Sequence, residues 1–247
     1  MLDRVKLLID DNKIDKFRNA NVLIVGLGGV GGACFEALVR MGINNLTVVD
    51  GDVFDVSNLN RQLLSTRDNI GHSKAKEAYL RGISINPDIL IDYREMFLDS
   101  SNIDELDFTK YDYVVDCCDT VSTKLLLIEK CIKNKIKIIS SMGTGNRFDP
   151  TKLIITDIWK TNYDPLAKVM RKLLREKGIK DKIMVLTSTE QPVKITSRTP
   201  GSTAFVPNSA GFCIASYIFN DIINIGSDNY GTRTKWFFRK SRKNNWR

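Results

Sequence analysis

The chain is 247 residues long, and 43% of its residues are hydrophobic and 27% charged. This composition is ordinary for a globular protein; it excludes a chain too short or too polar to bury a core, and it requires no second domain. The formal net charge is +8, of which seven charges fall in residues 232–247. Because the N-terminus lacks the layout of a secretory signal and the five cysteines lack regular spacing, we expect free thiols and a cytoplasmic protein.

The first strong motif joins a strand to a helix. An apolar run at residues 22–25 is followed by G-L-G-G-V-G-G at residues 26–32 and then by a helical pattern. Amide groups at the start of such a helix can bind a phosphate, and glycine allows its close approach. Glycines also occur in such turns for steric reasons alone. We assign four glycines to the phosphate turn: Gly26, Gly28, Gly29 and Gly31.

A second apolar run, residues 46–49, ends at Asp50, where an acidic residue is expected to accept hydrogen bonds from a ribose. Up to this point a nicotinamide-dependent enzyme fits equally well. A short stretch downstream then supplies amide and cationic donors, namely Asn60, Arg61, Gln62 and Lys74. A dinucleotide pyrophosphate can be held by backbone amides, whereas a triphosphate about to be split needs concentrated positive charge and a metal. The donors therefore favour ATP.

The remaining elements alternate between strands and helices. Short apolar runs rich in Val and Ile alternate with segments of helical period, which predicts a Rossmann-like, doubly wound, mostly parallel α/β sheet with helices on both faces. Ligands of such sheets bind beyond the carboxyl ends of the strands, where the glycine turn, Asp50 and residues 116–119 all lie. The expected later elements are strands at 89–91, 112–115 and 136–139, helices at 72–84 and 120–133, and further strands, expected to be antiparallel, at 151–158 and 182–187.

An amphipathic basic helix is expected after Asp164 and Pro165. Apolar residues recur there at helical spacing, and basic residues fall mainly on the other face. The apolar stripe is expected to pack in the core or in a dimer interface, while the basic face could follow an RNA backbone or simply be solvated. The stripe comprises Leu166, Val169, Met170, Leu173 and Leu174, and the basic face Lys168, Arg171, Lys172, Arg175 and Lys177.

The C-terminal part combines an apolar run with a basic tail. Residues 209–225 are interrupted by Asn220 and Asp221, so we expect a buried helix rather than a membrane span. A single domain is expected over residues 1–226, followed by a basic tail, residues 227–247, that also contains Trp and Phe. Such a tail suits stacking on unpaired nucleotides or peripheral contact with an anionic membrane, and a solubilising tail is the alternative.

The glycine turn, residues 50–62, Lys74 and the Asp116-Cys-Cys-Asp119 run together resemble the ubiquitin-activating-enzyme-like adenylating family, which includes MoeB and ThiF. Within that family, residues 140–172 are similar to the branch of tRNA threonylcarbamoyladenosine dehydratases. The similarity extends from about residue 4 to about residue 225. It implies an adenylation reaction, in which a carboxylate attacks the α-phosphate of ATP to give an acyl adenylate and pyrophosphate.

In that branch the carboxylate belongs to the threonyl part of the modified adenosine next to the anticodon, and an internal nitrogen displaces AMP to give a cyclic, hydantoin-type nucleoside. The resemblance thus implies ATP and Mg²⁺ as cofactors, tRNA as the substrate and a homodimer. Without the resemblance, Asp119 could also be a helix N-cap. The roles that the resemblance implies are phosphate binding by Asn60 and Gln62, charge neutralisation by Arg61 and Lys74, magnesium binding by Asp119, and contact of Arg4 with the partner subunit.

The cysteines help to separate the branches of the family. Enzymes that activate sulfur-carrier proteins commonly have two Cys-x-x-Cys pairs for a structural zinc, and this chain has none. Residues 140–212 contain no cysteine, so a thioester or persulfide step would fall to Cys213. We expect all the cysteines to be packed thiols. The single histidine, His72, receives no role.

Other functions stay open at this point. The main alternative is adenylation of the C-terminal carboxylate of a small ubiquitin-like sulfur-carrier protein, with sulfur-transfer proteins as partners. A nicotinamide-dependent oxidoreductase is a second alternative, and a non-catalytic protein that holds RNA or membrane through its tail is a third. Against the non-catalytic alternative, the chain carries Asp50, Arg61, Gln62, Lys74 and Asp119.

Overall fold

A computed structural model of the chain describes residues 1–197 and 199–224. The basic aromatic tail predicted at residues 227–247 lies outside the described residues, so its predicted contact with RNA or membrane stays a prediction. Among the residues that are described, no helix has the length and apolar character needed to cross a bilayer.

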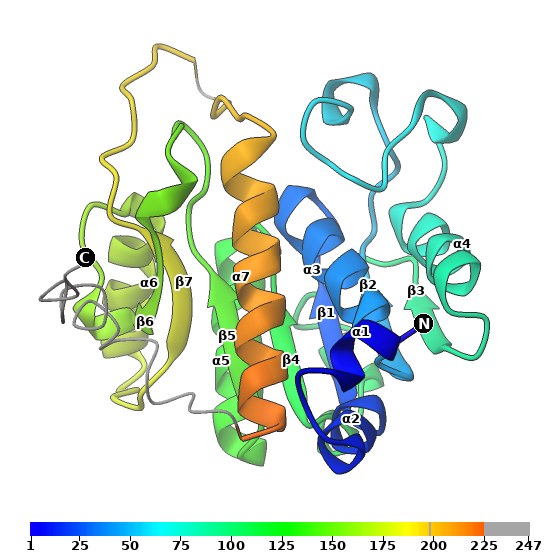
Figure 1. Cartoon of the computed structure of the whole chain (residues 1–247). Helices are drawn as coiled ribbons and strands as arrows, with labels where there is room; N and C mark the ends of the chain where they lie inside the picture. Colours follow the sequence, from blue (N-terminus) through cyan, green and yellow to red (C-terminus); the bar gives the residue numbers. More distant parts are fainter. Residues whose placement is uncertain (198, 225–247) are drawn as a thin grey trace, which may run out of the picture.

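One seven-stranded sheet forms the centre of the molecule (Figure 1), with the strand order β3-β2-β1-β4-β5-β7-β6. Every neighbouring pair is parallel except β6 and β7. The predicted doubly wound, mostly parallel sheet is therefore confirmed. The strands are β1 (Asn21–Val25), β2 (Asn45–Val49), β3 (Leu90–Arg94), β4 (Tyr113–Asp116), β5 (Lys137–Ser141), β6 (Leu153–Asp157) and β7 (Met184–Ser188).

The direction of β7 corrects the expectation that both late strands are antiparallel. β7 pairs in parallel with β5, and only β6, at the edge of the sheet, runs the other way. The physical reason is the connection: a long helical segment returns the chain to the end of the sheet at which β5 began, and such a crossover produces a parallel strand.

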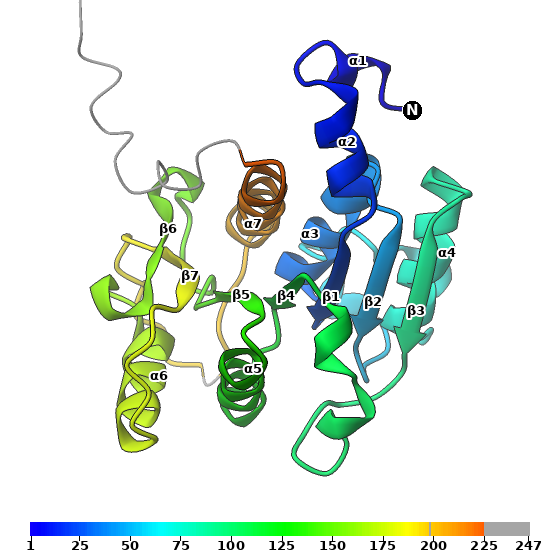
Figure 2. The ribbon, with the colours of Figure 1, turned by 90° about the horizontal axis from the view of Figure 1, so that it is seen from below.

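Helices cover both faces of the sheet. Figure 2 shows α3 and α7 on one face and α5 and α6 on the other. Because both faces are covered, successive side chains of the central strands are buried, apart from Asn21 at the start of β1, as the near-continuous apolar runs in the sequence require. The helices are α1 (Asp3–Lys6), α2 (Asp11–Arg18), α3 (Gly29–Arg40), α4 (Lys74–Ile85), α5 (Val121–Asn134), α6 (Pro165–Glu176) and α7 (Phe205–Ile222).

The last helix, α7, begins at Phe205, four residues before the start expected at residue 209. It is a buried helix, as predicted, and it runs beside α3 in the same direction (Figure 1). Gly211 makes this contact possible, because a Cβ at Gly211 would lie only 2.3 Å from the carbonyl oxygen of Val30. Both helices therefore start at the same edge of the sheet, beyond the carboxyl ends of the parallel strands.

Candidate functional site

The glycines of the turn have two different roles, because some are required by the backbone and one leaves space for a ligand. Gly26 has a φ of 89°, and a Cβ at Gly31 would lie 1.8 Å from the carbonyl oxygen of Gly26, so both positions are required by the fold itself. At Gly28, by contrast, an added Cβ would meet only the Gln62 Nε2 atom, at 3.8 Å. Gly28 is the N-cap of α3, and no side chain caps this helix. The start of α3 therefore offers amide groups and open space to an anion.

Asp50 is fixed beside the turn by two backbone donors. Its Oδ2 accepts a hydrogen bond from the Leu27 amide at 2.6 Å, and its Oδ1 accepts one from the Asp52 amide at 2.8 Å. Burial raises the pKa of the Asp50 carboxyl, and these two amides oppose that shift. The carboxylate thus lies next to the phosphate turn, as expected of a group that binds a ribose.

Lys74 is the first residue of α4, which is capped by the Ser73 hydroxyl. Its ammonium group lies 3.0 Å from Asp52 Oδ2, and the Lys74 side chain is 7% exposed whereas that of Asp52 is 56% exposed. A buried lysine held by one solvent-exposed carboxylate can exchange that partner for a phosphate.

Arg61 and Asn60 form a second set of donors. The Arg61 guanidinium donates to the Ser57 carbonyl at 2.8 Å and to Asn60 Oδ1 at 3.0 Å. The Asn60 amide in turn donates to the Ser202 carbonyl at 2.9 Å, which joins this segment to the stretch before α7. Gln62 is buried, and its Oε1 atom has no hydrogen-bond partner among the described residues, so it is available to a ligand donor.

The loop after β4 brings Asp119 to the same edge. The Cys117 amide donates to the Val25 carbonyl at 2.8 Å, so this loop packs directly on the glycine turn. Asp119 is exposed, and its only described contact is the Thr120 hydroxyl at 3.4 Å. Thr120, not Asp119, is the N-cap residue of α5, so the alternative role of Asp119 as a helix cap is wrong.

The sequence over residues 3–189 matches the model of the ThiF family. The chain belongs to the ThiF family. It is 35% identical over 237 residues to the tRNA threonylcarbamoyladenosine dehydratase of Bacillus subtilis (strain 168), covering 89% of this chain and 93% of the relative. It is 38% identical over 168 residues to the enzyme of that name from Escherichia coli (strain K12), covering 68% of this chain and 63% of the relative.

The fold agrees with that membership. The crystal structure of E. coli tRNA N6-threonylcarbamoyladenosine dehydratase, TcdA, in complex with ATP superimposes with a TM-score of 0.85 at 32% sequence identity, covering 91% of this chain and 94% of the other. A second structure of the same protein, in complex with AMP, gives the same TM-score of 0.85. The predicted membership of the ubiquitin-activating-enzyme-like family is therefore confirmed.

The predicted magnesium site of this ThiF-family chain has one protein carboxylate. Among the described residues, no group of three or more His, Cys, Asp and Glu side chains could hold a metal on its own. Mg²⁺ is commonly bound by one or two carboxylates together with substrate phosphates. The exposed and almost free carboxylate of Asp119 fits that kind of site.

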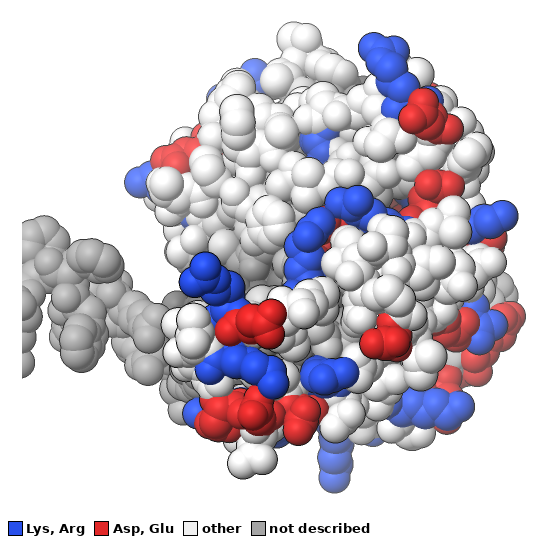
Figure 3. Space-filling model, turned by 45° about the vertical axis from the view of Figure 1, so that its right-hand side comes forward, with Lys and Arg blue, Asp and Glu red and all other residues white. Residues whose placement is uncertain are grey.

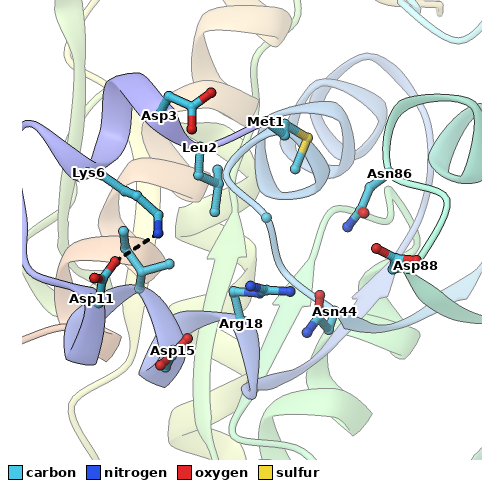
Figure 4. Close-up of a pocket in the computed structure, with 12 residues that line it drawn as sticks. Met1, Leu2, Asp3, Lys6, Asp11, Asp15, Arg18, Asn44, Asn86 and Asp88 are labelled. Carbon is cyan, nitrogen blue, oxygen red and sulfur yellow. Dashed lines mark ion pairs between the residues drawn. The ribbon is translucent and has the colours of Figure 1, made fainter.

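Arg4 lies away from the other predicted site residues. Leu2 packs at the carboxyl end of α3, where a Cβ at Gly42 would lie 2.7 Å from its Cδ1 atom. The glycine turn is at the other end of this helix, about 18 Å away for a helix of this length. Figure 4 shows the pocket near Leu2, lined by residues of both charges and containing a 3.0 Å ion pair between Lys6 and Asp11. The expected contact of Arg4 with a partner subunit stays a prediction.

The sequence analysis missed the start of α7 as part of the site. Pro207 is close to the turn, because a Cβ at Gly29 would lie 3.1 Å from the Pro207 Cβ. Two nearby side-chain oxygens, Thr203 Oγ1 and Asn208 Oδ1, are buried without a hydrogen-bond partner among the described residues. The available signal was Pro207 itself, since proline is common in the first turn of a helix.

The cysteines are packed thiols, as predicted. Cys34 and Cys131 are buried in helices, and desolvation raises the pKa of Cys131 to about 12. Burial also raises the pKa of Cys117, Cys118 and Cys213, so none of these thiols is activated. His72 forms an exposed contact of 3.0 Å with Glu77 through its Nδ1 atom, in agreement with a structural role at the start of α4.

Proposed function

We propose that this chain is an ATP-dependent enzyme that dehydrates threonylcarbamoyladenosine next to the anticodon of tRNA, through an acyl adenylate, with release of pyrophosphate and AMP. The observation that carries the proposal is the meeting of the open glycine turn, Asp50, Lys74 and Asp119 at one edge of the sheet. The name shared by the relatives, and the ATP and AMP complexes of TcdA, support it.

Nucleotide binding is the first step. The Asp50 carboxylate accepts hydrogen bonds from the ribose, and the uncapped start of α3 receives phosphate oxygens at Gly28. The side-chain N–H groups of Asn60 and Gln62 donate to the phosphates, which for Asn60 replaces the hydrogen bond to the Ser202 carbonyl. Because Asp50 is already fixed by the Leu27 and Asp52 amides, little reorganisation is needed when the nucleotide arrives.

Adenylation is the second step. The threonyl carboxylate attacks the α-phosphorus, the bond to the bridging oxygen breaks, and pyrophosphate leaves with the electron pair. Negative charge grows on the phosphate oxygens, and Arg61 and Lys74 are placed to neutralise it. Mg²⁺, held by Asp119 and the phosphates, would supply further charge neutralisation when bound.

Cyclisation is the third step. The internal nitrogen attacks the activated carbonyl and loses its proton, and the bond between that carbonyl and the phosphate oxygen breaks to release AMP. The carboxylate oxygen leaves on AMP, so the nucleoside loses the elements of one water. Since the nucleophile is tethered to the carbonyl, positioning provides much of the rate. No thiol is needed, in agreement with the raised pKa values of the cysteines.

The test is mass spectrometry of nucleosides from threonylcarbamoylated tRNA incubated with the protein, ATP and Mg²⁺, with a digestion mild enough to preserve the ring. We expect a loss of one water that depends on ATP and is matched by AMP. An unchanged nucleoside from folded, ATP-binding protein would contradict the proposal and favour the alternative, adenylation of a sulfur-carrier protein in association with sulfur-transfer partners. The homodimer and the cytoplasmic location remain predictions.

A further inference from the structure

Basic charge is concentrated on one helix and its flanks. Residues 160–182 contain eight Lys and Arg and three Asp and Glu, a net charge of +5, whereas the whole of residues 1–231 carries only +1. This segment contains α6, which lies at the opposite edge of the sheet from α4 (Figures 1 and 2). On the face in Figure 3, which brings the α4 side forward, basic and acidic side chains are intermixed. The positive field of the described domain is therefore centred on α6.

The exposed side of α6 carries a stripe of cations. Ala167, Met170 and Leu174 face the core, while Lys168, Lys172 and Arg175 are exposed at i, i+4 and i+7. At 1.5 Å per residue the stripe is about 10 Å long, roughly three phosphate-to-phosphate steps along one strand of a B-form duplex. We call these three residues the α6 stripe.

The stripe is only weakly neutralised. Lys168 has no ion-pair partner among the described residues, and Lys172 approaches Glu176 at 3.8 Å with its side chain 77% exposed. Arg171, which the sequence places with the basic face, instead turns inward and donates to the Thr161 carbonyl at 3.1 Å. Arg175 lies 5.4 Å from the centroid of the Trp159 ring, so the two lysines are the cations of the stripe that are most available to a polyanion.

The amino end of α6 reaches the reaction edge. The buried Asp164 carboxylate caps α6 and also accepts a hydrogen bond of 3.1 Å from the Gly143 amide, just beyond the end of β5. Tyr163 precedes this cap with a φ of 57°, a conformation that bulky residues rarely adopt. The buried Arg147 donates to the Tyr163 carbonyl at 3.2 Å, and the Tyr163 side chain is held 59% exposed.

We infer that the α6 stripe binds the backbone phosphates of the tRNA substrate while Tyr163 offers a stacking surface to an unpaired base at the reaction edge. The inference rests on the proposed function for the identity of the RNA. Cations that follow a backbone and an exposed aromatic ring that stacks on an unpaired base are the two usual means of binding single-stranded and loop RNA. Here they occur on consecutive turns of one segment that starts at the same edge of the sheet as the proposed ATP site.

The experiment measures tRNA binding and dehydration for K168A/K172A over a salt series. We expect the Kd and the KM for tRNA to rise at least fivefold, kcat at saturation to stay unchanged, and the slope of log Kd against log salt to fall by roughly 0.7 to 0.9 for each lysine removed. The matched control is K16A/K110A, which removes one lysine of α2 and one lysine of the turn that precedes β4. The control is expected to keep the wild-type values.

Tyr163→Ala separates stacking from charge. It is expected to raise the KM several-fold without changing the salt slope, because the ring carries no charge. If K168A/K172A binds tRNA with the wild-type Kd and slope while the wild type dehydrates it, the inference is wrong and the proposed function stands. If the wild type binds tRNA through the stripe but releases no AMP, the proposed function fails and the RNA surface stands. Loss of binding to an acidic carrier protein, with tRNA binding unchanged, would also overturn the inference.

Discussion

The buried ion pair between Asp116 and Lys124 allows a quantitative test of what holds the site. Both side chains are 0% exposed, and the Lys124 ammonium lies 3.0 Å from Asp116 Oδ2. It also donates to the Ser141 carbonyl at 2.7 Å, while Ser140 donates to the same carboxylate. Burial alone would lower the pKa of Lys124, but the Asp116 carboxylate raises it, so the lysine stays charged at neutral pH.

We expect Lys124→Met to lower the free energy of unfolding by about 3–5 kcal/mol, because it leaves Asp116 charged and unpaired in the core. The Coulomb energy of charges separated by 3.0 Å is about 5 to 6 kcal/mol at an effective dielectric constant of about 20, slightly above that range, because the cost of burying the lysine offsets part of the attraction. The double variant D116N/K124M removes both charges. It should regain most of the loss, since the amide oxygen introduced by Asp116→Asn can still accept from the Cys118 amide, which lies 3.2 Å from Asp116 Oδ1 in the native chain.

Urea unfolding followed by circular dichroism measures these differences. The matched control is Lys133→Met, an exposed lysine on the same helix, for which we expect a change within about 0.5 kcal/mol. A loss below about 1 kcal/mol for Lys124→Met would refute the reasoning, because it would mean that the lone carboxylate is hydrated or protonated at little cost. The reasoning would also be refuted if D116N/K124M were as unstable as Lys124→Met.

Three further predictions concern the proposed ATP site. Gly31→Ala is expected to unfold or severely destabilise the protein, because the added Cβ would lie 1.8 Å from the carbonyl oxygen of Gly26. Gly28→Ala should fold normally and bind ATP more weakly. Thermal unfolding measured with and without ATP distinguishes the two variants. Lys74→Ala and Asp119→Ala should each reduce AMP formation at least a hundredfold with unchanged circular dichroism, and near-normal turnover would remove that residue from the site. Burial raises the pKa of the Asp50 carboxyl, so it becomes protonated, and loses its hydrogen bonds from the ribose, at a higher pH than an ordinary carboxyl. The Kd for ATP should therefore rise as the pH falls from 7 toward 4, in the wild type and in Asp119→Ala alike. Because the pKa of Asp50 is raised in the folded state, its contribution to stability is greatest below its unfolded pKa and is lost as the pH rises through the folded pKa. A Kd for ATP that does not change with pH would contradict the assignment of Asp50 to the ribose.

The sheet and the first half of the site were predictable because their signals are local. Short apolar runs mark strands that are buried on both faces, and the carboxyl ends of parallel strands bring Gly28 and Asp50 together whatever the rest of the chain does. The amphipathic pattern after Asp164 likewise predicted α6. Within α6 the pattern failed for single residues: Val169 is 44% exposed although it falls on the apolar stripe.

The remaining features depend on contacts between distant segments. The sequence places Asp116 at a strand end but gives no sign of its partner Lys124, because their pairing requires the packing of α5 on β4 and β5. The start of α7 was missed because its neighbours at the glycine turn lie far away in the chain, and helical periodicity does not report such a contact. The direction of β7 was missed because the strand sequence does not encode which way its neighbour runs.

The helix caps divide the longer helices into two sets. Side chains cap α2, α4 and α6, through Asp10, Ser73 and Asp164. No side chain caps α3, α5 or α7, and these three helices start next to the glycine turn, next to Asp119 and next to Pro207. A cap is worth about 1 kcal/mol, so the chain forgoes about 3 kcal/mol at these three helix starts, whereas α4 and α6, which begin at the same edge of the sheet, keep their caps. Missing caps on well-packed helices are expected where a ligand accepts hydrogen bonds from the free amide groups. At α3 the proposed ligand is the phosphate of ATP.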